Sequence, residues 1–175
     1  ATHRVEACMS VFYEFDDVDA FTTGTVGMPG NRTFFMQVRS EGQRVTVKCE
    51  KQQTAAIVQY LRKVLSDLPP PEDRPMPGAL ELAEPVAASF VLGPIGLGYD
   101  RATDKLLIQL EEVGDVDEDG EMVDDDRGHV RLYVSRGQAA AFCDHADRLV
   151  ESGRPDCQWC TQPIDPDGHA CPRMN

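Results

Sequence analysis

Two segments of the sequence align without a gap over 22 residues, and this internal repeat constrains the fold more than any other feature. RVTVKCEKQQTAAIVQYLRKVL, residues 44–65, lies over HVRLYVSRGQAAAFCDHADRLV, residues 129–150. In both segments, alternating apolar residues indicate a half-buried strand, and the apolar period of 3.6 that follows indicates an amphipathic helix. Because strand, turn and helix coincide along the whole alignment, we interpret the segments as copies of one unit.

Weaker similarities upstream of these two segments extend the repeat to the preceding strands. The apolar run 34–38 resembles residues 106–110, and GTVG at 24–27 resembles GPIG at 93–96. Short glycine-containing turns between consecutive strands are typical of antiparallel hairpins. The sequence therefore predicts an α+β fold in which duplicated βββα (ββα-like) halves form an antiparallel sheet, or sheets, covered by helices. Coverage of one sheet face and of both faces are each compatible with this pattern.

These patterns also predict the domain organisation. A duplicated domain is expected over residues 10–153, with repeat one at 10–68 and repeat two at 86–153. The linker at 69–85 contains six prolines, which fix the backbone and remove hydrogen-bond donors, so we expect a stiff connector. A ligand for a proline-recognition domain is the alternative reading of this linker. Residues 154–175 are expected to form a separate zinc knuckle.

The expected knuckle contains the sequence CQWCTQPIDPDGHAC, residues 157–171. Cys157, Cys160, His169 and Cys171 have the residue types that zinc prefers, and four ligands close its tetrahedral shell, which points to structural Zn²⁺ rather than catalytic zinc. So short a segment buries little apolar surface, so metal binding would supply its folding free energy. Unrelated thiols, or a redox pair of Cys157 and Cys160, are the alternatives. Trp159 is expected to seal the knuckle against the domain.

An acidic insertion separates the second and third strands of repeat two. Within it, Asp115, Asp117, Asp119 and Asp126 occupy positions one, three, five and twelve of a calcium loop, and Gly120 stands at position six. Position twelve normally holds a longer Glu, and strands rather than helices flank the loop. A solvated acidic hairpin loop is therefore the alternative to calcium binding.

The two glycine-rich stretches suggest a ligand cleft between them. Backbone amides there could hold a phosphate, with Arg32, Lys48 and Gln53 lining the space, although the Gly-Lys-Ser/Thr ending of a phosphate loop is missing. This pattern allows binding of a small molecule such as a phosphorylated metabolite. The surroundings of His129 and His145 show no catalytic signature, which favours a protein that is not an enzyme.

Composition excludes several classes of protein. The formal net charge of −13 would repel a nucleic acid backbone, and we expect no nucleic acid partner. No apolar run approaches the roughly 18 residues of a membrane span. The opening ATHRVEACMS lacks a basic start and an apolar stretch, so the cytoplasm is the expected location.

Three motifs give the sequence a resemblance to a known family. FTTGTVGMPGNRTFFMQVR at 21–39, EKQQ at 50–53 and the ending CxxC...DPDGHACPR resemble an uncharacterised family from actinobacteria. The resemblance covers nearly the whole chain from about residue 10. Genes of that family accompany a histidine-phosphatase-like protein and a protein similar to lipid kinases, which implies an accessory or regulatory role in a shared pathway.

Two functions are compatible with these observations. The first is a non-catalytic adaptor or regulatory protein, in which the duplicated domain and the zinc knuckle present a rigid surface to a protein partner. The second is a small-molecule binder, or an enzyme, that uses the cleft between the glycine-rich stretches. A flat apolar patch would favour the adaptor, and a cleft lined by converging cations would favour the small-molecule binder.

Overall fold

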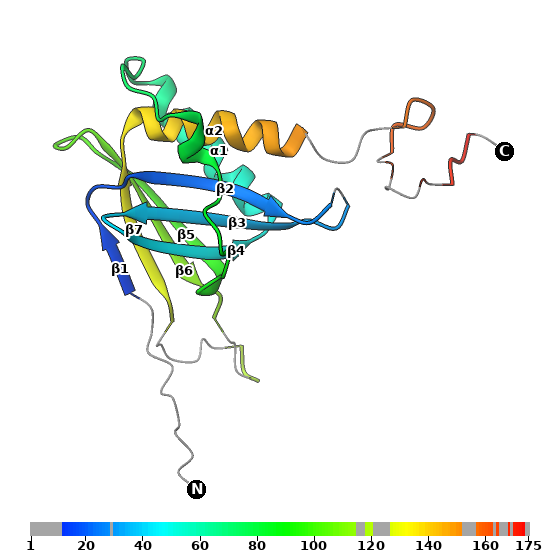
Figure 1. Ribbon diagram of the computed structural model, residues 1–175, viewed down its shortest axis with the longest axis horizontal. Coiled ribbons are helices and arrows are strands. Elements are labelled where there is room, and N and C mark those ends of the chain that lie inside the picture. The colour runs from blue at the N-terminus through cyan, green and yellow to red at the C-terminus, as the bar shows by residue number, and fades with distance from the viewer. Residues whose placement is uncertain are drawn as a thin grey trace, which may run out of the picture.

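The sequence elements form one strand-rich domain with two helices (Figure 1). The computed structural model describes residues 12–28, 30–114, 118–120, 127–151, 157–162, 164, 168 and 170–173. The predicted α+β class is confirmed. Three strands precede the second α-helix as expected, but four precede the first, so the first half has one strand more than the predicted βββα unit. In chain order the elements are β1 (Phe12–Phe15), β2 (Ala20–Val26), β3 (Thr33–Ser40), β4 (Gln43–Cys49), α1 (Lys51–Ser66), the 3₁₀ helix η1 (Pro77–Leu80), β5 (Phe90–Asp100), β6 (Lys105–Glu112), β7 (His129–Val134) and α2 (Arg136–Glu151).

The strands form one seven-stranded mixed sheet in the order β1-β7-β6-β5-β4-β3-β2. The pairs β2–β3, β3–β4, β5–β6 and β6–β7 are antiparallel, as predicted, whereas β1 does not pair with β2. The expectation of a purely antiparallel sheet is wrong at two places, since β5 pairs parallel to β4 and β1 pairs parallel to β7. The β4–β5 pair is parallel because α1 and the long linker carry the chain back to the same end of the sheet before β5 begins.

The sheet must curl strongly, because its two edge strands are close neighbours in sequence. Laid flat, seven strands would place β1 and β2 about 29 Å apart at the usual strand spacing. Only residues 16–19 join them, and such a connection spans at most about 18 Å. The sheet therefore wraps around the helices, and α2 contacts β2 at the edge far from β7.

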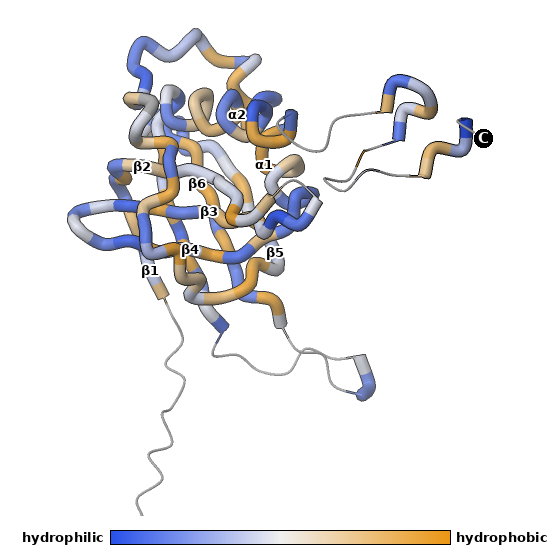
Figure 2. The backbone as a smooth tube through the Cα atoms, turned by 45° about the vertical axis from the view of Figure 1, so that its right-hand side comes forward, coloured by the Kyte–Doolittle hydropathy of each residue, from blue (hydrophilic) through white to orange (hydrophobic). Residues whose placement is uncertain are grey.

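The core lies between the concave face of the sheet and the two helices. The alternating apolar residues of β3, β4, β6 and β7 point inward, as the period of two predicts. Ile57 and Leu61 of α1, together with Phe142 of α2, are fully buried against them. Figure 2 shows hydrophobic residues recurring along the strands and helices, whereas the peripheral turns are hydrophilic.

Strand register tests the correspondence between the two halves. Phe34 pairs with Thr25 and Cys49, and Leu106 makes the equivalent pairs with Tyr99 and Val134. The predicted match of 34–38 with 106–110 agrees with these pairs. The glycine match does not, because the register places Gly98, not Gly93, in the position equivalent to Gly24. The short GxxG match is therefore not a structural equivalence.

The proline-rich linker crosses the outer face of the sheet. After α1, the carbonyl of Pro69 accepts a hydrogen bond from Arg136 at the start of α2. Further on, the backbone of Ala83 exchanges two hydrogen bonds with the buried Gln37 amide, at 2.8 and 3.1 Å. Figure 1 shows this green segment passing in front of β2, β3 and β4. The linker backbone therefore provides hydrogen-bond partners for polar side chains on the outer face of repeat one.

A glutamine in the first turn of each helix ties the two halves together. Gln53 Oε1 accepts a hydrogen bond from the Glu50 backbone, and Gln138 Oε1 accepts one from Ser135, which caps each helix N-terminus. The two Nε2 atoms then reach across to the other half. Gln53 donates to Leu92 at 3.0 Å, and Gln138 donates to Val18 at 2.6 Å.

Gln53→Ala is expected to destabilise the domain by about 1–3 kcal/mol, because it removes a helix cap and leaves backbone carbonyls of β5 without their donor. Chemical denaturation measures the change. The neighbouring Gln52 is exposed, so Gln52→Ala is the matched control and should change stability by less than about 0.5 kcal/mol. Equal effects of the two substitutions would contradict the structural role of Gln53.

Candidate metal centre

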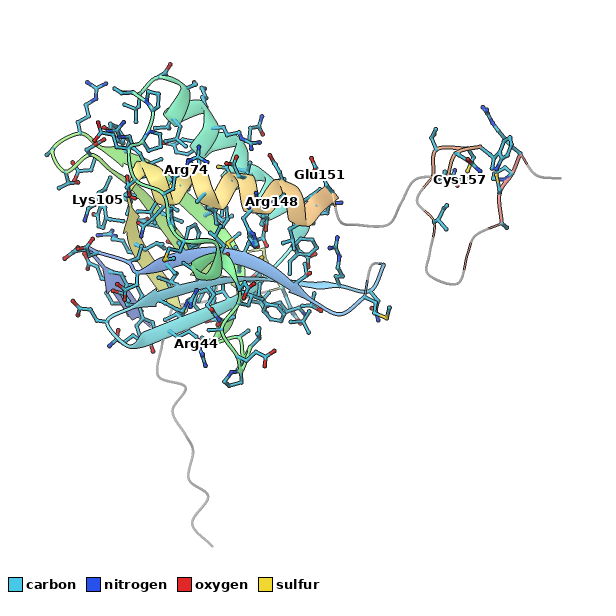
Figure 3. All side chains as sticks on the ribbon, turned by 45° about the horizontal axis from the view of Figure 1, so that its top comes forward. Arg44, Arg74, Lys105, Arg148, Glu151 and Cys157 are labelled. Carbon is cyan, nitrogen blue, oxygen red and sulfur yellow. The ribbon has the colours of Figure 1, made fainter. Side chains whose placement is uncertain are left out.

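Three cysteine sulfurs meet in the C-terminal part of the chain. The Sγ atoms of Cys157, Cys160 and Cys171 all lie within 4.8 Å of one another. Figure 3 shows Cys157 in a small loop beyond the end of α2, where Glu151 lies. We call residues 157–173 the knuckle. The spacing of its cysteines predicted this meeting of sulfurs, and that part of the prediction is confirmed.

Local backbone geometry holds the first two cysteines of the knuckle. Thr161 donates its backbone N–H to the Cys157 carbonyl at 2.8 Å, and Cys157 donates its own N–H to Gln162 at 2.8 Å. Thr161 adopts a left-handed conformation with φ of 62°, which closes the turn. A turn of this kind brings the two sulfurs of a C-x2-C sequence to the same side.

The distance between sulfurs fits a shared metal ion. Cys157 and Cys171 have their Sγ atoms 3.9 Å apart. Two thiolates bound to one tetrahedral zinc at about 2.3 Å would lie about 3.8 Å apart. A disulfide would require a sulfur separation of about 2.05 Å, and both residues are free cysteines. The residues therefore fit a tetrahedral metal ion of the zinc type.

The backbone also favours negative charge on the first ligand. The N–H groups of Cys160 and Trp159 point at the Cys157 sulfur and lower the pKa of its thiol. Arg173 directs its backbone N–H at Cys171 in the same way, but burial and the neighbouring sulfurs of Cys160 and Cys157 raise the pKa of Cys171. Three clustered thiols repel one another when ionised, so a cation is what allows all three to be thiolates.

Comparison with known proteins identifies the family of this chain. The chain matches the family described as "Protein of unknown function (DUF3090)" over residues 13–171. The chain belongs to this family. The matched range begins in β1 and ends at Cys171, so the DUF3090 region includes the seven-stranded sheet and all three clustered cysteines. Searches of curated proteins and of solved structures gave no match. The predicted actinobacterial distribution stays a prediction.

Several predicted ligands lie outside the described residues. His169, the expected fourth zinc ligand, is one of them, as are Asp115, Asp117 and Asp126 of the expected calcium loop. Asp119 is described and exposed. The acidic insertion does fall between β6 and β7, as expected. Calcium binding by this insertion stays a prediction.

The structure gives the three residues of the expected ligand cleft separate surroundings. Arg32 donates to the Leu149 carbonyl at the end of α2 and lies over the Phe34 ring. Lys48 is exposed on the outer side of β4, because its neighbours along the strand point into the core. The side-chain amide of Gln53 accepts a hydrogen bond from the backbone of Glu50 and donates one to the backbone carbonyl of Leu92. Gly24 lies within β2 and the glycines of the second stretch lie within β5, whereas Gly27 and Gly30 lie in the connection after β2 with positive φ.

The remaining described thiols and histidines have structural surroundings. Burial raises the pKa of Cys49 to about 11 and that of Cys143 to about 12, so both thiols are neutral and unreactive at physiological pH. His129 packs edge-on against Phe12. Burial lowers the pKa of His145, although a hydrogen bond with the Thr23 backbone acts in the opposite direction. Neither helix of the described chain is long and apolar enough to cross a membrane.

One groove on the surface was not predicted from the sequence. A groove of about 500 Å³ runs between α1 and α2. Small or short apolar side chains line it, and an ion pair between Arg62 and Asp147 lies at its rim. In the sequence, only the small residues Ala55 and Ala146 could have indicated this groove. The packing of the two helices against each other is needed to show that these alanines face it together.

Proposed function

We propose that this protein is a non-catalytic adaptor or regulatory protein of the cytoplasm, whose C-terminal knuckle is held in shape by structural Zn²⁺. The observation that carries the proposal is the meeting of three sulfurs at a separation expected for shared tetrahedral zinc. His169 completes the ligand set in this proposal. With four protein ligands the metal has no open position for water or substrate, which argues for a structural role.

The adaptor role is supported by the contrast between the domain and the knuckle. The domain presents hydrogen-bonded strands and capped helices, and its described thiols and histidines lie in structural surroundings. The knuckle, in contrast, is a small surface ordered by metal, on which Gln158, Thr161 and Gln162 are exposed. A protein partner is therefore proposed, and the acidic charge of the chain argues against nucleic acid.

We also infer that the domain arose by duplication of one βββα unit. The equivalent strand pairs of Phe34 and Leu106 support this inference, as do the equivalent bonds of Gln53 and Gln138. Each half supplies a helix cap that bonds a strand region of the other half. A single unit would leave these donors and acceptors without partners, so the proposed ancestor would have been a homodimer.

Metal analysis tests the zinc part of the proposal. Full-length protein purified without added metal is expected to contain about one zinc per chain, because one closed site takes one ion. Elemental analysis by mass spectrometry measures the ratio. Protein with no bound metal after purification under reducing conditions, and no uptake on addition of zinc, would overturn the proposal.

The adaptor part needs a separate measurement. Affinity purification from the native cell, compared between the zinc-loaded protein and its Cys157→Ser variant, should show a stoichiometric partner protein that the variant loses. Recovery of a bound small molecule in place of a protein would instead favour a ligand-binding function.

A further inference from the structure

The groove between α1 and α2 has the composition of a binding site for one large aromatic side chain. Ala55 and Val58 of α1 face Ala146 and Val150 of α2 across it. Its volume of about 500 Å³ exceeds that of any single side chain, so an inserted residue could enter with part of its backbone. The floor is apolar and the rim is charged, which suits a residue that has an apolar body and one polar atom.

Trp159 is such a residue, and the knuckle does not bury it. Its side chain is 55% exposed, although tryptophan contributes more apolar area on burial than any other residue. A buried indole N–H needs an acceptor. The groove rim offers the carboxylates of Asp147 and Glu151, and the Arg62 guanidinium beside Asp147 can stack on an aromatic face.

The covalent connection keeps the knuckle within reach of this groove. Glu151, the last residue of α2, lines the groove, and Cys157 opens the knuckle (Figure 3). The five residues between them span at most about 21 Å, whatever path they take. The α2 residues that line the groove lie at positions 146–151, along about 8 Å of helix. Every part of the groove is therefore within reach of Trp159.

We propose that the metal-loaded knuckle docks onto its own domain by inserting Trp159 into the groove between α1 and α2. The short tether gives Trp159 an effective concentration in the millimolar range or above at this site. A separate partner, or a second copy of the chain, would need far higher intrinsic affinity to compete at micromolar concentration. The inference rests on the proposed metal site, since the metal holds Trp159 in the turn between two ligands.

Tryptophan fluorescence tests the docking directly, because Trp159 is the sole tryptophan of the chain. In the zinc-loaded full-length protein, Trp159 emission should be blue-shifted and protected from acrylamide. Ala55→Glu places a charge in the groove at an exposed helical position, where it should not disturb folding. It should lower the docked-to-undocked ratio at least about tenfold, because a carboxylate would be buried against the indole. Emission should then shift to the red and quenching should increase.

Ala56→Glu is the matched control, since Ala56 is also exposed on α1 but does not line the groove. Its fluorescence should equal that of the wild type. Identical emission of the two variants, with one zinc per chain retained, would overturn the docking and leave the metal site standing. Loss of zinc from the wild type would overturn the proposed function itself. A blue shift that appears only at high protein concentration would also overturn the inference, because the occupant would be another copy.

Discussion

Replacing Cys157 by serine is expected to remove the metal from the protein and unfold the knuckle while the domain stays folded. Structural zinc sites of this size contribute about 10–16 kcal/mol of binding free energy, and that energy is what orders them. A serine hydroxyl stays protonated at neutral pH and is a poor zinc ligand. Metal analysis should show the loss, and limited proteolysis should cut the variant between α2 and its C-terminus. The domain should keep a single thermal transition, with its midpoint lowered by a few degrees because the docked knuckle no longer stabilises the groove.

Cys143→Ala provides the control for the loss of a thiol. Cys143 is buried in α2 with a raised pKa, so its removal should lower stability and leave the zinc content unchanged. His169→Ala then tests the fourth ligand, and zinc should be held more weakly but still by the three sulfurs. Full zinc content in Cys157→Ser would show that the metal binds elsewhere in the chain.

The sulfur ligands were predictable because their geometry is local. The C-x2-C spacing requires one turn, and prolines and glycine further along the segment favour the return of the chain to Cys171. No long-range contact is needed to bring the sulfurs together. The groove between α1 and α2 is the opposite case, because Ala55 and Ala146 meet only through the packing of the whole domain.

The fold shows the same division between local and long-range features. The strand and helix that begin at Gln43 and Lys51 follow from hydrophobic periods within the segment itself, and so do their counterparts in the second half. The parallel junctions depend on where the linker and the β1–β2 connection lead the chain. Proline content predicted a stiff linker, but it carried no information about the bonds between Ala83 and Gln37.

Phe142→Ala is expected to cost about 3–5 kcal/mol of folding free energy, which is a large share of the 5–15 kcal/mol typical of a domain. The Phe142 ring is fully buried and stacks on Phe21 with ring centroids 4.5 Å apart. This contact joins α2 of the second half to β2 of the first half, across the concave side of the curled sheet. Its loss would leave a cavity that β2 cannot close without disturbing its backbone hydrogen bonds to β3.

Urea denaturation with saturating zinc measures this effect, because metal excess keeps the state of the knuckle constant between variants. Phe12→Ala is the matched control, since Phe12 is 61% exposed, and it should cost less than about 1 kcal/mol. If the two halves were independent folding units, Phe142→Ala would lower the midpoint of only one of two separate transitions. A single transition that moves as a whole is expected, because Gln53, Gln138 and the Phe21–Phe142 stack each join one half to the other.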